Sequence, residues 1–324
     1  MRAVVFTGSG GNEVVRVEER RDPVPCGEEV VVRARFAALN PADLVQRAGS
    51  YPAPAGSPPD IPGLEVTGVV EACGERVTAW RKGDRVFGLV GGGGLADRVL
   101  VHERCLAPVP ERLDDRDAAA VPEAFITAHD AVRSQAELTA GETLLVHGAA
   151  GGVGTAAVQI GLVTGARVLG VVRSERASAA VRELGAEPIE NETFAHRVDE
   201  ATEGRGADVV LELVGAPHFE DDLEALALRG RVVIVGVGAG QETTIQLRTL
   251  MQKRAVVRGT VLRPRPLEEK AAAVRAFERE VLPALADGRM RPLVDSVFPG
   301  ADVTEAFDRL AGSGKVGKVL IEFS

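Results

Sequence analysis

A glycine-rich stretch from Gly148 to Gly154 holds the residues best suited to chemistry in this sequence. It reads Gly-Ala-Ala-Gly-Gly-Val-Gly, after an apolar run at 144–147 and before an apolar helical pattern. Strand, glycine turn and helix predict the first half of a dinucleotide-binding βαβ unit, whose helix N-terminus donates backbone N–H groups to a pyrophosphate. A purely structural turn is the alternative, but both flanks fit the cofactor interpretation. We therefore expect cofactor contacts from Ala150, Gly151, Gly152, Val153 and Gly154.

The residues after the next predicted strand, 167–172, indicate which nicotinamide cofactor is used. NAD-binding proteins place an acidic residue there to hold the ribose 2′-hydroxyl. This chain has Arg173, Ser174 and Arg176 instead, and these side chains can bind a 2′-phosphate. Two observations argue against a phosphate site. The carboxylates of Glu190 and Glu192 would repel a phosphate, and an arginine pair can also lie in solvent without binding any ligand. The prediction is NADPH.

Tyr51 is the only tyrosine, and it opens a Pro/Gly-rich loop that runs to residue 62. Its phenol can donate a hydrogen bond or a proton to negative charge developing on an acceptor oxygen. The alternative is an aromatic rim on the loop. Both interpretations stay open at this point.

Metal ligation is not predicted. The three cysteines, Cys26, Cys73 and Cys105, are isolated, and the five histidines share no metal-ligand spacing. We expect the thiols to be reduced and each histidine to be exposed or hydrogen-bonded. His147, at the end of the first strand of the βαβ unit, is expected to help shape the glycine turn.

The elements that position these residues fall into two groups. Residues 1 to about 120 contain short apolar runs separated by turns, which predicts a compact, partly barrel-like β domain with a helix that begins at Pro41 after the cap Asn40. Residues 121–264 alternate strand and helix and predict a doubly wound Rossmann sheet of six parallel strands. Residues 265–324 are expected to return to the first domain. The predicted strands of the sheet are 144–147, 167–172, 186–189, 208–214, 231–236 and 255–259. The predicted helices are 118–134, 174–184, 194–202, 219–228, 247–253 and 267–286, and a last strand is predicted at 318–323.

Composition excludes several classes of function. The 324 residues carry a net charge of −9, which argues against nucleic acid or an anionic membrane as partner. No apolar run approaches the roughly 20 residues needed to span a bilayer. The N-terminal residues lack the apolar segment of a signal peptide, so a cytoplasmic protein is expected.

Six segments, in this order along nearly the whole chain, resemble the medium-chain dehydrogenase/reductase superfamily, and within it the quinone oxidoreductase (zeta-crystallin) branch. They are Leu39-Asn40-Pro41-Ala42-Asp43, Arg47-Ala48-Gly49-Ser50-Tyr51, Pro62-Gly63-Leu64-Glu65, Ala119-Ala120-Val121-Pro122-Glu123, Ala149-Ala150-Gly151-Gly152-Val153-Gly154 and Gly317-Lys318-Val319. The resemblance implies that the β-rich domain is GroES-like and catalytic. It also implies a homodimer, paired through the last strand of the Rossmann sheet.

The resemblance also implies roles for individual residues. Asn40 is expected beside the nicotinamide ribose, with a part in catalysis, and Tyr51 is expected to face the substrate. Further cofactor contacts are implied at Gly236, Val237, Leu262 and Lys318. Zinc-dependent relatives carry a histidine where this chain has Leu64, and they carry thiolates that are missing here. Asp43 and Glu65 are the polar residues of that region, and we assign neither a catalytic role.

The sequence therefore predicts a zinc-independent, NADPH-dependent quinone oxidoreductase. Without a metal Lewis acid, hydride transfer needs an acceptor that is already electron-poor, such as a quinone or an α,β-unsaturated carbonyl. An enoyl or ene reductase of a biosynthetic pathway is the alternative enzyme. A non-catalytic NADPH-binding redox sensor or structural protein is the alternative from another class.

Overall fold

The structure, a computed structural model, describes residues 1–323 and divides into two compact units. Unit 1 comprises residues 1–126 and 262–324, and unit 2 comprises residues 127–261. The chain thus leaves unit 1 and returns to it, and the changeovers lie a few residues from the boundaries expected from the sequence. No helix within residues 1–323 is long and apolar enough to cross a membrane.

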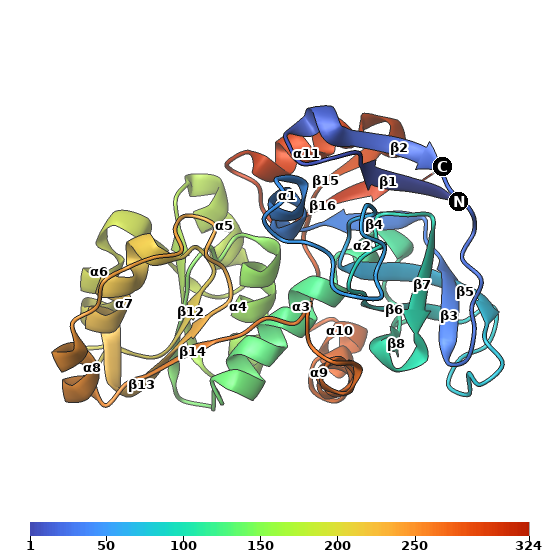
Figure 1. Ribbon diagram of the computed structural model, residues 1–324. Coiled ribbons are helices and arrows are strands. Elements are labelled where there is room, and N and C mark those ends of the chain that lie inside the picture. The colour runs from blue at the N-terminus through green and yellow to red at the C-terminus, as the bar shows by residue number, and fades with distance from the viewer. Residues whose placement is uncertain (324) are drawn as a thin grey trace. The chain divides into compact units, whose positions relative to one another are not determined.

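Unit 2 is built on a six-stranded parallel sheet in the order β11-β10-β9-β12-β13-β14. Strands β12, β13 and β14 of this sheet can be followed in Figure 1. The strands are β9 (Thr143–Val146), β10 (Arg167–Val172), β11 (Glu187–Glu190), β12 (Ala207–Glu212), β13 (Leu226–Ile234) and β14 (Val256–Gly259). The helices are α4 (Gly152–Thr164), α5 (Glu175–Glu183), α6 (Phe194–Ala201), α7 (Phe219–Ala225) and α8 (Leu247–Lys253). The strand order reverses beside β9, as in a doubly wound dinucleotide-binding sheet.

The core of unit 2 explains why these segments form a sheet covered by helices. Strands β9, β10 and β12 read as near-continuous apolar runs because both faces of the sheet are buried there. Leu145, Leu169 and Val210 on three strands pack in one cluster with Phe194 of α6 and Leu223 of α7. The predicted Rossmann sheet, with all six strands, is confirmed.

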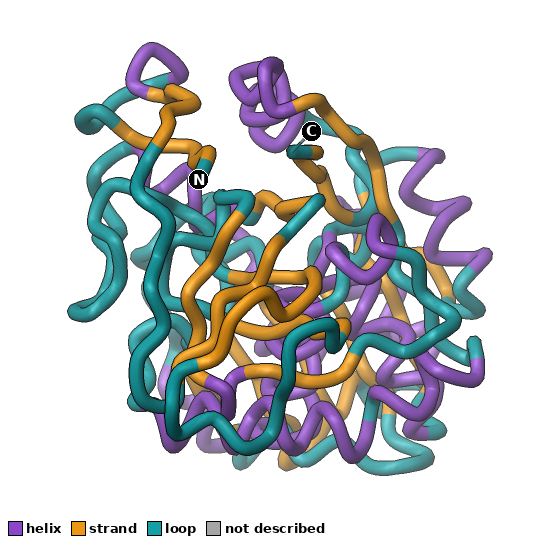
Figure 2. The backbone as a smooth tube through the Cα atoms, turned by 90° about the vertical axis from the view of Figure 1, so that its right-hand side faces the viewer, coloured by secondary structure: helices purple, strands orange, loops and turns teal. Residues whose placement is uncertain are grey.

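Unit 1 consists of antiparallel and mixed sheets, and its strands face the viewer in Figure 2. Its strands are β1 (Arg2–Phe6), β2 (Val15–Glu19), β3 (Glu29–Arg33), β4 (Phe36–Leu39), β5 (Glu65–Cys73), β6 (Arg85–Leu89), β7 (Arg98–His102), β8 (Leu106–Pro108), β15 (Val294–Pro299) and β16 (Lys318–Glu322). They form a pair β1-β2, a five-stranded sheet β7-β3-β5-β6-β8 and a three-stranded sheet β15-β16-β4. The helices of this part are α1 (Pro41–Arg47), α2 (Asp115–Ala119), α3 (Pro122–His129, which ends in unit 2), α9 (Leu267–Glu280), α10 (Leu282–Asp287) and α11 (Val303–Ala311).

The last strand, β16, pairs antiparallel with β4 of the N-terminal segment and parallel with β15. The C-terminal segment thus pairs with a strand from the N-terminal part of the chain. It carries Lys318, the first residue of β16, into the β-rich unit.

Two predicted helices are interrupted, and proline accounts for both interruptions. The helix expected over 118–134 is α2, then α3 beginning at Pro122, then a π-helical turn at Asp130–Gln135. Proline is favoured at the first helical position, and the residue before it avoids helical conformation. The helix expected over 267–286 is broken at Val281, since Pro283 has no N–H to donate to the carbonyl of Arg279.

Candidate functional site

In unit 1 the site is built around the N-terminus of α1, where Asp43 is buried. Its carboxylate accepts hydrogen bonds from the backbone N–H of Asn40 (2.8 Å) and of Gly63 (3.1 Å). Gly63 has a left-handed φ of +103°, and an added Cβ would lie 2.3 Å from the backbone nitrogen of Leu95. Burial raises the pKa of Asp43 to about 6, although the two N–H donors and Lys318 act against this shift. Asp43 thus fixes the backbone at the start of α1 and, with it, the position of Asn40.

Asn40, Glu65 and Lys318 meet in a buried cluster, although 253 residues separate the last two along the chain. One oxygen of Glu65, Oε1, accepts from Asn40 Nδ2 (2.8 Å) and from Lys318 Nζ (2.8 Å). The other, Oε2, accepts from the backbone N–H of Glu123 at the start of α3 (2.8 Å). Lys318 Nζ also donates to Asn40 Oδ1. A buried ion pair of this kind holds its geometry because every polar atom has a partner.

Tyr51 lies half-buried after α1, and a buried arginine that the sequence did not single out holds it. The guanidinium of Arg263 lies over the Tyr51 ring, 4.8 Å from its centroid, and donates to the Tyr51 carbonyl (3.1 Å). The same group donates to Gln46 Oε1 (2.6 Å) and to the carbonyl of Gly91 (2.8 Å). Burial raises the pKa of the Tyr51 phenol, so the phenol stays protonated at neutral pH and can act as a donor.

In unit 2 the glycine turn joins β9 to α4. The cap residue Gly151 has no side chain to accept from the first turn of the helix, so the N–H groups there are open to a ligand. An added Cβ at Gly154 would lie 2.2 Å from the carbonyl oxygen of Gly148, so only glycine allows the helix to begin this close to the turn. These features fit the pyrophosphate of a dinucleotide. Of the expected contacts, Gly151, Gly152 and Val153 are partly exposed, whereas Ala150 and Gly154 are buried.

Arg173, Ser174 and Arg176 follow β10 directly and are all exposed. Ser174 is the N-cap of α5, and its Oγ accepts from the backbone N–H of Ala177 (3.3 Å). The hydroxyl proton of Ser174 remains available for donation. The three side chains thus lie at one strand end, where a 2′-phosphate is expected.

The remaining expected cofactor contacts lie in two loops. Gly236 follows β13, and an added Cβ there would lie 2.3 Å from the carbonyl oxygen of Leu213, so the loops after β12 and β13 lie in direct contact. Val237 beside it is exposed. Leu262 is buried and belongs to unit 1, just beyond the end of the Rossmann unit.

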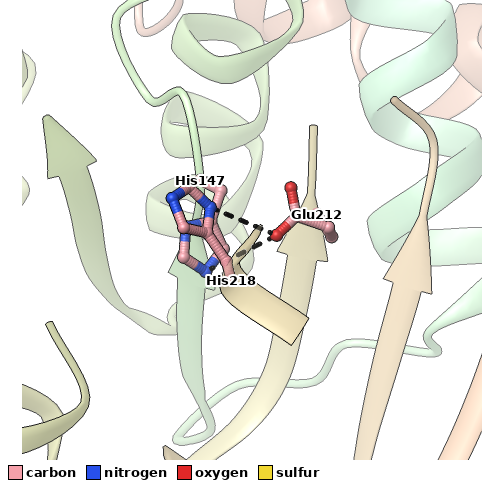
Figure 3. A group of neighbouring side chains, drawn as sticks. All are labelled: His147, Glu212 and His218. Carbon is pink, nitrogen blue, oxygen red and sulfur yellow. Dashed lines mark ion pairs between the residues drawn. The ribbon is translucent and has the colours of Figure 1, made fainter. Parts of the chain in front are cut away.

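A buried polar cluster that sequence reasoning missed lies at the carboxyl ends of β9 and β12. We call it the quartet: His147, Glu212, His218 and Asp222. His147 Nε2 lies 2.6 Å from Asp222 Oδ1. Glu212 Oε2 lies 3.5 Å from His218 Nδ1 and 3.9 Å from His147 Nε2 (Figure 3). The prediction that His147 is hydrogen-bonded is confirmed. The sequence did contain a clue to this cluster. A doubly wound strand order places β12 beside β9, and so brings Glu212 at the end of β12 near His147 just after β9.

The quartet holds residue types that bind metals, and ligand atoms of His147, Glu212 and His218 all lie within 4.8 Å of one another. A zinc ion bound to imidazole lies in the ring plane, about 2.0–2.1 Å from the nitrogen. The two rings are stacked, with centroids 4.5 Å apart and planes only 21° apart. Stacked, nearly parallel rings direct their in-plane nitrogen lone pairs along similar planes and not towards one shared ion between them. The geometry therefore fits a hydrogen bond between His147 and Asp222, with His218 at ion-pair distance from Glu212.

Two family models match the chain. One match lies within unit 1, and most of the other lies within unit 2. Residues 27–111 match the alcohol dehydrogenase GroES-like domain, and residues 152–279 match the zinc-binding dehydrogenase family. Among curated relatives, the quinone oxidoreductase of Lama guanicoe is 34% identical over 99% of this chain and 97% of its own length. The quinone oxidoreductase of Pseudomonas aeruginosa is 34% identical over 99% of both chains.

Solved structures with the same fold include several kinds of oxidoreductase. An NAD-dependent alcohol dehydrogenase is similar with a TM-score of 0.88 and 30% identity, over 100% of both chains. A mycobacterial protein complexed with NADPH has a TM-score of 0.89 at 27% identity, also over 100% of both chains. The CurK enoyl reductase has a TM-score of 0.88 at 26% identity, over 100% of this chain and 99% of its own.

The zinc that one family description mentions does not fit the residues of unit 1. Leu64, buried and without a ligand atom, stands beside Glu65. The carboxylate of Glu65 is already neutralised by the Lys318 ammonium. None of the three cysteines of the chain lies in this cluster. A cationic side chain therefore stands where a metal would need anionic or neutral ligands.

Proposed function

Because the chain belongs to the quinone oxidoreductase branch of the medium-chain dehydrogenase/reductase superfamily, we propose that it transfers hydride from NADPH to quinones without a metal ion. At the coarser level the chain is an oxidoreductase that uses a nicotinamide cofactor. The observation that carries the proposal is the Lys318–Glu65–Asn40 cluster. A buried ammonium on Glu65 leaves no ligand set for a Lewis acid, so the acceptor must be electron-poor before it binds.

The cofactor is proposed to bind along the glycine turn, from Ala150 to Gly154, with its 2′-phosphate at Arg173, Ser174 and Arg176. When bound, reduced nicotinamide supplies the hydride, and the protein supplies orientation. Gly236, Val237 and Leu262 are proposed to line the same cofactor.

Asn40 and Lys318 are proposed to hold the nicotinamide ribose. The hydrogen bonds of both side chains to Glu65 support this, because they fix two polar groups that a flexible loop would leave mobile. Glu65 is then a positioning residue, since it acts through Asn40 and Lys318.

Tyr51 is proposed to donate a hydrogen bond to the acceptor oxygen as negative charge develops there. Its phenol stays protonated because burial raises its pKa. Arg263 supports this role by fixing both the ring and the carbonyl of Tyr51.

An acceptor screen that follows the absorbance of reduced nicotinamide tests the proposal. It uses purified protein, NADPH and NADH, and a panel of benzoquinones, naphthoquinones, enones and enoyl thioesters. Turnover of quinones with NADPH, unaffected by a chelator, is expected. Cofactor binding with negligible oxidation across the whole panel would contradict the proposal and favour a non-catalytic NADPH-binding protein.

An enoyl or ene reductase is the second candidate. The similarity to the CurK enoyl reductase supports it, together with a phenol placed as a donor in unit 1. A kcat/KM for an enone or enoyl thioester well above that for every quinone would make this candidate the function.

A further inference from the structure

The quartet connects three loops at the carboxyl ends of the Rossmann strands. Glu212 is the last residue of β12, and its carboxylate accepts from the backbone N–H groups of Val214 and of Gly215 (2.8 Å). Its carbonyl oxygen accepts from the backbone N–H groups of Val235 (2.9 Å) and Gly236 (3.2 Å). One buried residue thus fixes the loop after β12 and the start of the loop after β13.

The loop at 213–215 lies between the other two. An added Cβ at Gly148 would lie 3.6 Å from a methyl of Val214, which is ordinary contact distance. On its other side, Leu213 lies directly against Gly236, as described above. The backbone N–H of Ala239 donates to the carbonyl of Val214 (2.9 Å). A shift of this loop would therefore move both the glycine turn and the Gly236–Val237 loop, because close-packed neighbours transmit displacement.

His147 fixes the third connection, between the end of β9 and α7. It immediately precedes Gly148, and its ring is fully buried against Phe194 and His218. Its Nε2 is bound to Asp222 Oδ1 on α7, and its backbone N–H donates to the carbonyl of Leu211 on β12 (3.0 Å). The glycine turn therefore begins at a residue whose side chain and backbone are both held.

We propose that His147, Glu212 and Asp222 are positioning residues for the nicotinamide cofactor, which they serve by fixing the three loops against one another. The inference rests on the proposed function, because two of those loops, the glycine turn and the loop with Gly236 and Val237, carry expected contacts to the cofactor. The three side chains are fully buried, so they act through the backbone of the turn and not by contact with the ligand. These residues therefore affect the affinity for the cofactor. They do not affect binding of the quinone, which involves residues of unit 1.

The test compares three substitutions on α7, two at Asp222 and one at its neighbour Asp221. Asp222→Ala removes the acceptor for His147, whereas Asp222→Asn keeps an oxygen at that place. Asp221→Ala is the matched control, since Asp221 is the adjacent acid and is exposed. NADPH dissociation constants are measured by fluorescence titration, and kcat and both Michaelis constants are measured with a quinone. Denaturant unfolding of each variant is measured in parallel.

We expect Asp222→Ala to raise the dissociation and Michaelis constants for NADPH about 10-fold, the effect of losing roughly one buried hydrogen bond. The kcat at saturating NADPH and the Michaelis constant for the quinone should change little. Asp222→Asn should restore most of the affinity, and Asp221→Ala should match wild type. A folded Asp222→Ala protein with wild-type NADPH affinity would overturn the inference.

A double variant keeps the inference testable if Asp222→Ala does not fold. His147→Phe with Asp222→Leu replaces both partners by apolar groups of similar size, which is nearly neutral for stability. We expect this protein to fold and still to bind NADPH about 10-fold more weakly, because the hydrogen bond that aligns the turn is gone. Wild-type affinity in the double variant would overturn the inference.

Two further outcomes separate this inference from the proposed function. Wild-type protein that binds neither NADPH nor NADH would overturn the proposed function, and this inference with it. If wild-type protein bound one zinc ion per chain and the Glu212→Gln variant bound none, the quartet would be a metal site. That result would overturn this inference and leave the proposed function intact.

Discussion

Arg173 and Arg176 are the two residues on which the proposed preference for NADPH rests. Both are exposed at the end of β10, one on each side of the helix cap Ser174. Charge-assisted hydrogen bonds to a phosphate are worth roughly 1.5–3 kcal/mol each. Replacing both arginines by alanine should therefore raise the Michaelis constant for NADPH at least about 10-fold and hardly change that for NADH. Steady-state kinetics with each cofactor measure this.

Arg182, an exposed arginine one to two turns further along α5, supplies the control. Arg182→Ala removes the same charge away from the strand end and should leave both Michaelis constants unchanged. An unaltered constant for NADPH in the Arg173/Arg176 variant would place the phosphate site elsewhere.

Tyr51 should assist the reaction without being indispensable. A quinone accepts hydride readily, and its oxyanion can take a proton from water. Loss of an essential acid typically costs about 10²–10⁴-fold in rate. We expect Tyr51→Phe to lower kcat for quinones by less than about 100-fold, and to lower it further for weakly activated enones, which need the donor more.

The Tyr51→Phe ring keeps the contact with the Arg263 guanidinium, so the comparison isolates the hydroxyl. NADPH binding should not change. If turnover of every acceptor disappeared while NADPH still bound, Tyr51 would be an obligatory acid, and the enoyl reductase interpretation would gain.

At the scale of elements, one buried carboxylate links β15, α11 and the start of β16 by hydrogen bonds. Asp295 on β15 accepts from Arg309 of α11 through both oxygens (2.7 and 2.8 Å) and from the backbone N–H of Val316 (2.9 Å). Val316 precedes β16, which carries Lys318 into the site. The link therefore helps to set where β16 begins.

This link predicts a dependence of stability on pH. Burial acts to raise the pKa of Asp295, but hydrogen bonds from Arg309 and Val316 outweigh it and lower the pKa from 3.8 to about 2. A lowered pKa in the folded state means that the stabilisation is complete above the ordinary value and is lost as pH falls towards 2. Asp295→Asn should cost about 1–2 kcal/mol at neutral pH, after allowance for solvent screening around Arg309.

Urea unfolding of wild type and Asp295→Asn at neutral pH and between the two pKa values, at about pH 3, measures this difference, which should be smaller at the lower pH. Asp221→Asn, an exposed acid in unit 2, serves as the control and should show no such dependence. A difference between wild type and Asp295→Asn that grew on acidification would contradict the assignment.

At the scale of the whole molecule, β14 suggests how the protein assembles. It is the last strand of the six-stranded sheet, with β13 as its single neighbour, and all four of its residues are exposed. Val256 and Val257 on it and Val261 beyond it are exposed apolar side chains. An open edge with apolar side chains invites pairing with another chain. We therefore predict a homodimer that pairs through this edge.

Light scattering after size exclusion, at micromolar concentration, should give twice the chain mass. Lysines at both Val256 and Val257 should shift the protein towards monomer by charging the edge. Val24→Lys, at an exposed apolar residue of unit 1, should leave the mass unchanged. A monomeric wild type would refute the prediction.

The sequence alone determined the architecture of unit 2 and its glycine turn. Apolar runs of strand length that alternate with helical patterns are local signals, and each of the six strands was readable within its own segment. The same holds for the start of α1 at Pro41, because helix caps and first-turn prolines act over three or four residues. Periodicity did not reveal β4, β15 or α11. The apolar pattern also runs on past Pro122 and Pro283, where proline interrupts the two helices.

Only the tertiary structure decided which side chains meet. Lys318 reaches Glu65 because β16 pairs with β4, and Arg263 reaches Tyr51 across 212 residues of chain. His147 meets Asp222 because the sheet places β12 directly beside β9. Such contacts depend on strand order and on burial of charge far from water, and neither is written in any local window of residues. For this reason the glycine turn could be predicted from sequence, whereas the residues that hold it in place could not.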